Sequence, residues 1–239
     1  MVPFNKKTEF NFQTGEVILI NKPLGWTSFD VVNKIRYLLR SYTGIRKIKV
    51  GHAGTLDPLA SGLLILCTGK FTKKIEEFQG LEKEYTGTFH IGATTPSYDR
   101  ETEIDQNYET GHVDEKTLIN ATRQFIGNID QVPPLFSALK IKGKRAYELA
   151  RGKEDVKLSA RKVTINAFEL THIDIPKVAF RISCGKGTYI RSIAHDFGQA
   201  INSGAHLSSL IRTKIGSFNL EDSLTIEQFN NIINPQNVS

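Results

Sequence analysis

The alternation of hydrophobic and polar residues along the chain predicts a mixture of strands and helices. Short apolar or alternating runs predict strands at 16–23, at Leu63–Cys67, at 84–93, and at about 163–172 and 178–184. Apolar residues at helical spacing predict helices over 27–42, 70–79, 114–127, 188–201 and about 225–233. Strands and helices interleave without the regular alternation of a doubly wound sheet. We therefore predict an α+β fold with a mixed, largely antiparallel sheet and flanking helices.

Some segments carry more local signals. Thr27, followed three residues later by Asp30, is a variant of the capping box and marks the start of the helix at 27–42. Residues 1–15 are polar and predict an N-terminal extension, while 94–113 are turn-rich and predict a mobile loop. The segment 132–155 should begin extended at its prolines and become helical near Lys144.

Charge is unevenly placed. The chain has 239 residues and a net charge of +6, and residues 140–162 alone hold nine basic and three acidic residues, an excess of six. A local basic excess suits a polyanion such as nucleic acid. A solvated lysine-rich arm with no partner is the alternative that charge alone leaves open.

The remaining composition favours an ordinary protein of a reducing compartment. Cys67 and Cys184 lie in apolar runs and form no CxxC pair, so we expect buried thiols. The six histidines show no metal-ligand spacing, and we expect no metal site. No apolar run approaches the roughly 20 residues needed to cross a bilayer, and no signal peptide is evident. We expect a cytoplasmic protein that binds no membrane.

The stretch "GHAGTLDPLASGLLILCTG" at 51–69 is the first candidate site. It places a single carboxylate, Asp57, in a polar turn directly before the apolar run Leu63–Cys67. Such anchoring suits a catalytic acid or nucleophile whose side chain must keep a fixed orientation. An Asp-Pro pair alone, however, also fits an ordinary turn.

Two further motifs stay ambiguous on their own. "CGKGTYIR" at 184–191 lacks the third glycine of a dinucleotide fingerprint, which argues against a nucleotide cofactor. Its Tyr189 and Arg191 could contact a planar ring and a carboxylate, or could be a buried tyrosine beside a surface arginine. Tyr85 in "KEYTGTF" could equally be a core residue at the start of a strand.

Taken together, the motifs resemble those of one family. "INKPLGWTS", "GHAGTLDPLASGLLIL", "KEYTGTF", "PPLFSALKIKGKRAYELAR", "GKGTYIRSIAHDFG" and "GAHLSSLIRTKIGSF" occur in the same order as in the bacterial TruB-type tRNA pseudouridine synthases. The resemblance covers roughly residues 16–220, and "GHAGTLDPLASG" is its most specific part.

The resemblance implies roles for individual residues. Asp57 would be the essential catalytic residue of a reaction that detaches uracil from ribose, turns it and rejoins it through carbon 5, with no cofactor. Arg191 would be its cationic partner. His52 would contact the target nucleotide, Tyr85 would stack on the extruded base, and Tyr189 and Leu210 would line the pocket. Lys22 and Pro23 would mainly be scaffolding.

The resemblance also implies a partner and a domain organisation. The basic segment at about 132–162 would close over the T-stem loop of tRNA and bind its phosphates. Its candidate contacts are Lys140, Lys142, Lys144, Arg145 and Arg151. We expect one catalytic domain over 16–239 without a C-terminal PUA domain, no guide RNA, and a monomer. The expected activity is formation of pseudouridine at position 55 of tRNA.

Two other functions remain open at this stage. The chain could be a tRNA-binding or tRNA-folding module whose catalysis is dispensable. It could also be a glycoside or nucleoside hydrolase, but such enzymes usually need a second positioned carboxylate, and 51–69 contains only Asp57.

Overall fold

The computed structural model describes residues 9–137, 140, 141, 144, 145 and 158–235. Their contacts group into two compact units, each described by itself below: unit 1 is Met1–Glu84 with Ile211–Ser239, and unit 2 is Tyr85–Leu210. The strands β4 (Lys83–Ile91) and β12 (Ala205–Ile215) each have residues in both units.

Unit 1 is built around the strand β3 (Ala60–Thr68), which pairs antiparallel with β1 (Val17–Lys22) and with β2 (Val50–His52). The C-terminal part of β12 follows β3 in the strand order and pairs with β13 (Phe218–Asn219). The helical elements of the unit are α1 (Ser28–Thr43), the 3₁₀ helix η2 (Gly69–Lys74), α2 (Ile75–Gly80), the 3₁₀ helix η4 (Leu220–Asp222) and α6 (Ile226–Ile233).

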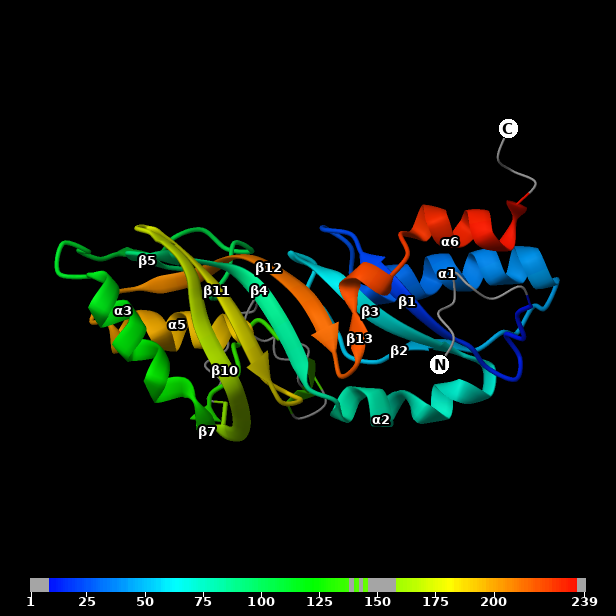
Figure 1. Cartoon of the computed structure of the whole chain (residues 1–239), viewed down its shortest axis with the longest axis horizontal. Helices are drawn as coiled ribbons and strands as arrows, with labels where there is room; N and C mark the ends of the chain where they lie inside the picture. The colour runs from blue at the N-terminus through cyan, green and yellow to red at the C-terminus, as the bar shows by residue number, and fades with distance from the viewer. Residues whose placement is uncertain (1–8, 138–139, 142–143, 146–157, 236–239) are drawn as a thin grey trace. The chain divides into compact units, whose positions relative to one another are not determined.

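Both faces of β3 are covered, which explains its unbroken apolar sequence. Leu64 and Leu66 point into a core formed with α1 and α6, and Leu63 and Ile65 point into a second core formed with α2. Figure 1 shows α1 and α6 on one side of β1 and β3, and α2 on the other. A strand buried on both faces needs no polar alternation.

In unit 2 the strand order is β12, β4, β11 (Lys177–Cys184), β10 (Arg161–Asp174) and β7 (Gly127–Gln131). β10 pairs antiparallel with β11 and with β7. Two short hairpins, β5 (Ala93–Thr94) with β6 (Gln106–Asn107) and β8 (Lys140–Ile141) with β9 (Lys144–Arg145), complete the strands described.

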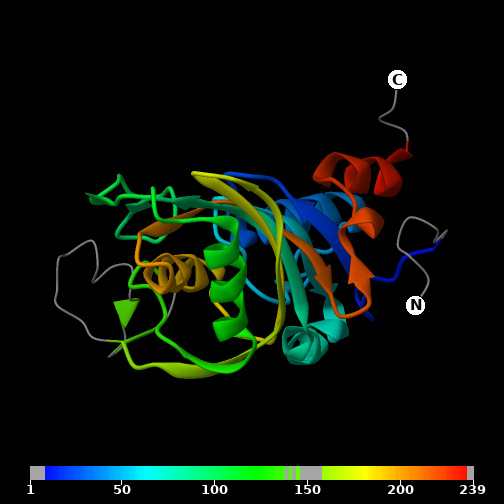
Figure 2. The same ribbon diagram turned by 60° about the vertical axis from the view of Figure 1, so that its left-hand side comes forward.

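The helices α3 (Glu115–Thr122) and α5 (Ile190–Ala200) lie on one face of β10 and β11 (Figure 2), and the 3₁₀ helix η3 (Arg123–Phe125) follows α3. Aromatic rings fill the core between them. Phe89 stacks on Phe180 with ring centroids 4.2 Å apart, and Phe197 of α5 lies 5.5 Å from the rings of both Phe89 and Phe168.

The predicted fold class is confirmed, since the sheets are largely antiparallel and carry flanking helices. The capping box at Thr27 and Asp30 is present, and both cysteines are buried. Two local predictions were wrong. The β5–β6 pair lies largely within 94–113, where a mobile loop was expected, and Lys144 lies in a strand. The strands β2, β7 and β12 were not predicted at all. The rest of the helix predicted beyond Lys144 lies mostly outside the described residues.

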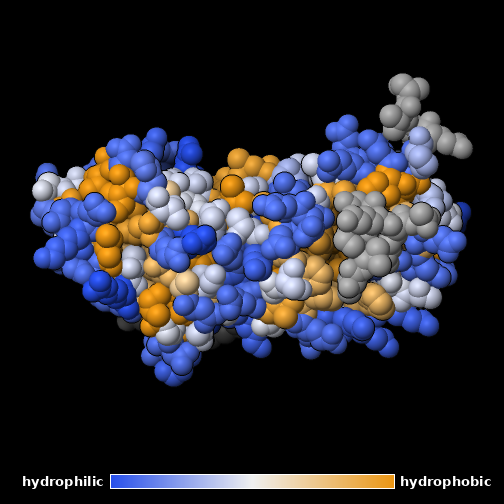
Figure 3. Space-filling view, in the orientation of Figure 1, coloured by the Kyte–Doolittle hydropathy of each residue, from blue (hydrophilic) through white to orange (hydrophobic). Residues whose placement is uncertain are grey.

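The surface is mixed. On the face drawn in Figure 3, hydrophilic residues predominate and hydrophobic ones form small groups. No helix in the described part of the chain has the length and apolar character required to cross a membrane.

Candidate active site

Asp57 lies in the loop between β2 and β3, and the two strands fix the backbone of this loop. The backbone N–H of Ala53 donates to the carbonyl of Ile65 at 2.9 Å, and that of Ala60 donates to the carbonyl of Asp57 at 3.0 Å. Gly54 adopts a left-handed conformation with φ of +100°, which only glycine tolerates easily. The anchored turn predicted from the sequence is therefore present.

A second set of hydrogen bonds ties the same loop to the start of α1. The hydroxyl of Ser28 accepts from the N–H of Leu56 at 2.9 Å and donates to its carbonyl at 3.2 Å. The N–H of Gly25 donates to the carbonyl of Pro58 at 2.8 Å. The residues on both sides of Asp57 are thus held, so the backbone directs this half-buried carboxylate.

Lys22, at the end of β1, supplies a buried cation that interacts with Asp57. Its side chain is fully buried, and its ammonium donates to the carbonyls of Pro23 at 2.9 Å and Trp26 at 2.6 Å. Burial lowers the pKa of Lys22 to about 8, while the negative charge of Asp57 acts in the opposite direction. Lys22 therefore holds the backbone after β1, and its pKa also responds to the charge of Asp57.

Arg212 of β12 is the second buried cation of this site. It is 1% exposed, and its guanidinium donates to the carbonyl of Leu63 at 2.8 Å and to that of Gly54 at 3.1 Å. It bridges β3 and the Asp57 loop. Burial, followed by the charge of Arg212, lowers the pKa of His52, while a backbone hydrogen bond with Gly54 acts in the opposite direction. The Nδ1 atom of His52 is buried, and no described group hydrogen-bonds to it.

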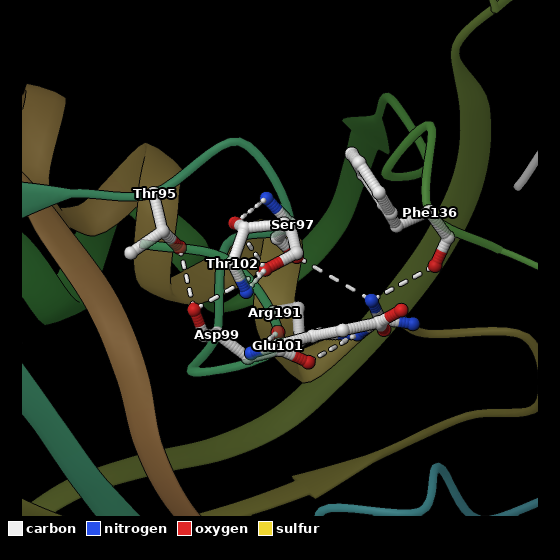
Figure 4. Close-up of polar contacts among 7 residues, drawn as sticks. All are labelled: Thr95, Ser97, Asp99, Glu101, Thr102, Phe136 and Arg191. Atoms are coloured by element: carbon white, nitrogen blue, oxygen red, sulfur yellow. Dashed lines mark hydrogen bonds and ion pairs between the residues drawn. The ribbon is translucent and has the colours of Figure 1, made fainter. Parts of the chain in front are cut away.

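In unit 2, Arg191 is buried near the start of α5 and has a defined orientation (Figure 4). Its Nη1 atom donates to the carbonyls of Phe136 at 2.9 Å and Ser97 at 3.4 Å, and its Nε atom lies 3.5 Å from the carboxylate of Asp99. Arg191 is 3% exposed, which excludes the alternative of a surface arginine. Its pairing with Asp57 remains a prediction.

The loop that carries Asp99 is itself closely hydrogen-bonded. The carbonyl of Asp99 accepts from the hydroxyls of Thr95 at 2.6 Å and Ser97 at 3.2 Å, and its carboxylate accepts from the N–H of Glu101 at 2.9 Å. Ser97 and Thr102 are joined by a further hydroxyl contact of 2.9 Å, and Figure 4 shows these groups converging beside Arg191. The carboxylate that holds Arg191 is therefore positioned by its own turn.

Tyr189 is the N-cap residue of α5, and both of its backbone groups are hydrogen-bonded by one amide. Its N–H donates to the side chain of Gln131 at 2.8 Å, and its carbonyl accepts from the same side chain at 3.1 Å. The guanidinium carbon of Arg161 lies 4.6 Å from the centre of the tyrosine ring, within the range of a cation–π contact. The ring is half-buried, so one part of it is available to a ligand.

Tyr85 of β4 and Leu210 of β12 lie in neighbouring strands and are both buried, at 9% and 8% exposure. The same strands are joined by the hydroxyl of Ser208, which donates to the carbonyl of Thr88 at 3.1 Å. Among the predicted RNA contacts, Lys140 pairs with Arg145 across the β8–β9 hairpin, and Lys144 also lies in it. Lys142 and Arg151 lie outside the described residues.

Two protein-family models match this chain, and both describe pseudouridylate synthases. Residues 40–190 match the model of the TruB family pseudouridylate synthase N-terminal domain, and residues 191–237 match that of the tRNA pseudouridylate synthase B C-terminal domain. The chain belongs to the TruB family of pseudouridylate synthases.

Its relatives within the TruB family include proteins named tRNA pseudouridine synthase B. That of Flavobacterium johnsoniae is 56% identical, over 93% of this chain and 97% of the relative. That of Phocaeicola vulgatus is 54% identical, over 95% of this chain and 97% of the relative. The resemblance inferred from the motifs is confirmed.

A solved structure also matches. The chain in the crystal structure of a Cbf5–Nop10–Gar1 complex has a TM-score of 0.70 and 30% sequence identity, covering 94% of this chain. This chain spans 57% of the length of that one.

The residues that the motifs of the TruB family suggested fall into two groups. Unit 1 holds Asp57 and His52, while unit 2 holds Tyr85, Tyr189, Arg191 and Leu210.

Sequence reasoning missed Arg212 and Asp99. A buried arginine in the unpredicted strand β12 has no local signal, and nothing separates Asp99 in sequence from the other acids of its loop. Among the described residues, no group of three His, Cys, Asp or Glu side chains is arranged to hold a metal ion.

Proposed function

We propose that this chain converts uridine to pseudouridine at position 55 in the T loop of tRNA, with Asp57 as the essential catalytic carboxylate. The observation that carries the proposal is the loop of Asp57 itself. A single half-buried carboxylate is held by backbone hydrogen bonds on both sides and is coupled to the buried Lys22. Relatives that are 54–56% identical over nearly their whole length are named tRNA pseudouridine synthase B.

The chemistry is an isomerisation in which atoms and electrons balance. The bond between N1 of uracil and C1′ of ribose breaks, the base turns while it stays bound, and a bond forms between C5 and C1′. The proton on C5 is lost and N1 becomes protonated, so no oxidant, reductant or energy source is required. Asp57 acts either as a nucleophile on the sugar or base, or by assisting cleavage of the glycosidic bond.

The other predicted residues would surround the reacting base. Arg191, oriented by Asp99, would pair with Asp57 and keep it ionised. Tyr85 would stack on the extruded uracil and help to remove the proton from C5, with Tyr189 and Leu210 as further walls of the pocket. His52, whose pKa is lowered by burial and whose Nδ1 atom is free of described partners, would contact the nucleotide as it leaves its loop.

The target uridine must leave its stack before Asp57 can reach it, and this extrusion needs an aromatic and apolar pocket. The basic segment at 132–162, including Lys140, Lys142, Lys144, Arg145 and Arg151, would hold the phosphates of the T-stem loop. We propose that residues 16–239 form the catalytic domain of a cytoplasmic monomer that uses no guide RNA.

The decisive experiment measures tritium release from a tRNA transcript carrying tritium at C5 of its uridines. We expect the wild-type protein to release close to one equivalent per tRNA, and Asp57→Asn to release none while still binding tRNA. Asp222→Asn, a change of an exposed carboxylate elsewhere in unit 1, is the matched control and should behave as wild type. A transcript with cytidine at position 55 should release no tritium.

Other outcomes would point to the competing functions. Bound tRNA with no tritium release from the wild-type protein would overturn the synthase and leave a tRNA-binding or tRNA-folding module. Free uracil in the reaction would instead indicate a hydrolase.

A further inference from the structure

A second basic region lies in unit 1. It does not show in the net charge of the chain, because acidic residues elsewhere offset it. Residues 31–56 contain six basic residues and no aspartate or glutamate. These residues are Lys34, Arg36, Arg40, Arg46, Lys47 and Lys49. All are exposed except the half-buried Arg36. Within the ranges that the structure describes, none of the six forms a salt bridge, so their charges are open to a partner.

Two of these residues, Arg36 and Arg40, share one side of α1. Phe29, Asn33, Arg36 and Arg40 follow one another at helical spacing along this side. Arg36 donates to the side chain of Asn33 at 2.9 Å and to the carbonyl of Val50 at 3.2 Å. Because Val50 begins β2, this side of α1 runs along the strand that leads into the catalytic loop.

The connection from α1 to β2 carries three more of the six basic residues. Arg46, Lys47 and Lys49 lie in it, and all three are exposed. We call Phe29, Arg36, Arg40, Arg46, Lys47 and Lys49 the α1 face. One end of it reaches the Asp57 loop, because Ser28 in the first turn of α1 is hydrogen-bonded to Leu56.

The length of the α1 face sets how far a partner must extend. With 16 residues, α1 is about 24 Å long at about 1.5 Å per residue. If the bases of the bound strand stack about 3.4 Å apart, as they do in B-form DNA, about seven nucleotides span this distance. The far end therefore lies several nucleotides from a base bound at Asp57.

The chemistry of the α1 face fits RNA. Its five cations favour a polyanion, Asp30 in the first turn being the one acid of α1. Flexible, exposed lysines and arginines suit phosphates at no fixed sequence. Phe29, 60% exposed at the end nearest the catalytic loop, offers a ring on which an unpaired base can stack.

We propose that the α1 face binds the sugar-phosphate backbone of the substrate tRNA outside the T-stem loop. This inference rests on the proposed function, because it places the target uridine at Asp57. It assigns to unit 1 an RNA contact separate from the basic segment at 132–162. The α1 face adds affinity for a complete folded tRNA and takes no part in the chemistry.

The test compares two RNAs and two charge-reversed proteins. One protein carries Arg40→Glu, Arg46→Glu and Lys47→Glu. The matched control carries Lys116→Glu, Arg123→Glu and Lys177→Glu, which are exposed residues of unit 2 with the same change in charge. Each protein binds a full-length tRNA transcript and an isolated T-stem-loop hairpin over a range of KCl concentrations, and circular dichroism verifies folding.

We expect the α1 variant to bind full-length tRNA roughly tenfold or more weakly. The slope of the logarithm of its binding constant against the logarithm of the KCl concentration should become shallower by about two to three, because three phosphate contacts are lost. Its affinity for the hairpin and its single-turnover rate at saturating tRNA should match those of the control. Equal tRNA affinity in both variants would overturn the proposal, and equal losses for tRNA and hairpin would overturn the assignment to RNA outside the T-stem loop. Because binding is the readout, the result stands apart from whether tritium is released.

Discussion

The two buried cations near Asp57 differ in how they respond to pH. Arg212 remains charged at any pH that a protein tolerates, and its hydrogen bonds to two carbonyls compensate for its burial. Lys22 also donates to two carbonyls, but an amine can lose its proton when it is buried. Lys22 is therefore the residue whose titration reports on the charges around it.

The pKa of Lys22 should report on the charge of Asp57. Burial lowers it to about 8, and among the charges that act on Lys22 the carboxylate of Asp57 ranks before Arg212 and Asp30. Asp57 raises the pKa, so Asp57→Asn should lower it further, and Asp30→Asn should lower it by less. Carbon-13 NMR of lysine ε-carbons over pH 6–11 measures this directly. An unchanged titration in Asp57→Asn would show that the two charges are not coupled.

Asp99 should matter for the orientation of Arg191. Breaking a buried ion pair by removing one partner typically costs about 3 kcal/mol or more, so Asp99→Asn should lower the free energy of unfolding by about that amount. Misplacement of Arg191 should also slow single-turnover tritium release roughly tenfold to a hundredfold with little change in tRNA affinity.

Asp105→Asn is the matched control for Asp99, because Asp105 is an exposed acid of the same loop that is bonded to Thr94 at 2.7 Å. If both variants slow tritium release equally, the effect belongs to the loop and not to the contact with Arg191.

Among the elements, β3 explains why the loop of Asp57 can be held so firmly. Its residues pack into one core with α1 and α6 and into another with α2, so both faces resist displacement. The loop of Asp57 ends where this strand begins. The rigidity of the Asp57 loop thus comes from burial three to eleven residues further along the chain.

Substitutions on the two faces of β3 should therefore be equally harmful. Leu64→Ala and Ile65→Ala each remove a fully buried side chain and should each lower the free energy of unfolding by about 2–5 kcal/mol. Thr171→Ala, at an exposed position of β10, should change it by less than about 0.5 kcal/mol. Urea unfolding measures all three, and a mild effect at either β3 position would mean that its face is not tightly packed.

Elements whose hydrophobic residues recur with a simple period can be predicted from the sequence. Elements that bury polar residues cannot be predicted in this way. The apolar run of β3 and the helical spacing of α1 were readable for this reason. In β12 the period is broken by a fully buried arginine, Arg212, whose cost is offset by carbonyls from distant segments. Asp99 was missed for the same reason, because the polar turn that buries it looks like a solvated loop.

For the molecule as a whole, net charge is a poor guide to where charge lies. The excess of six in residues 140–162 equals the net charge of the chain, which invites the conclusion that the rest is neutral. The rest instead combines the acid-free stretch at 31–56, itself +6, with acids elsewhere. A nucleic acid responds to the local excess within about one Debye length, roughly 10 Å at 0.1 M salt, and not to the total.

If both basic regions contact tRNA, their contributions should add. The α1 variant, a Lys142→Glu/Lys144→Glu variant and their combination form a double-mutant cycle. Because the two regions belong to different units and would meet different phosphates, the losses in binding free energy should sum to within about 0.5 kcal/mol.

The isolated hairpin provides the contrast to this cycle, since it should respond to changes at Lys142 and Lys144 alone. Filter binding at a fixed KCl concentration gives all the affinities required. A combined loss much smaller than the sum would mean that the two regions share the same phosphates. In that case the α1 face would extend the contact with the T-stem loop, and the RNA outside that loop would have no separate site on unit 1.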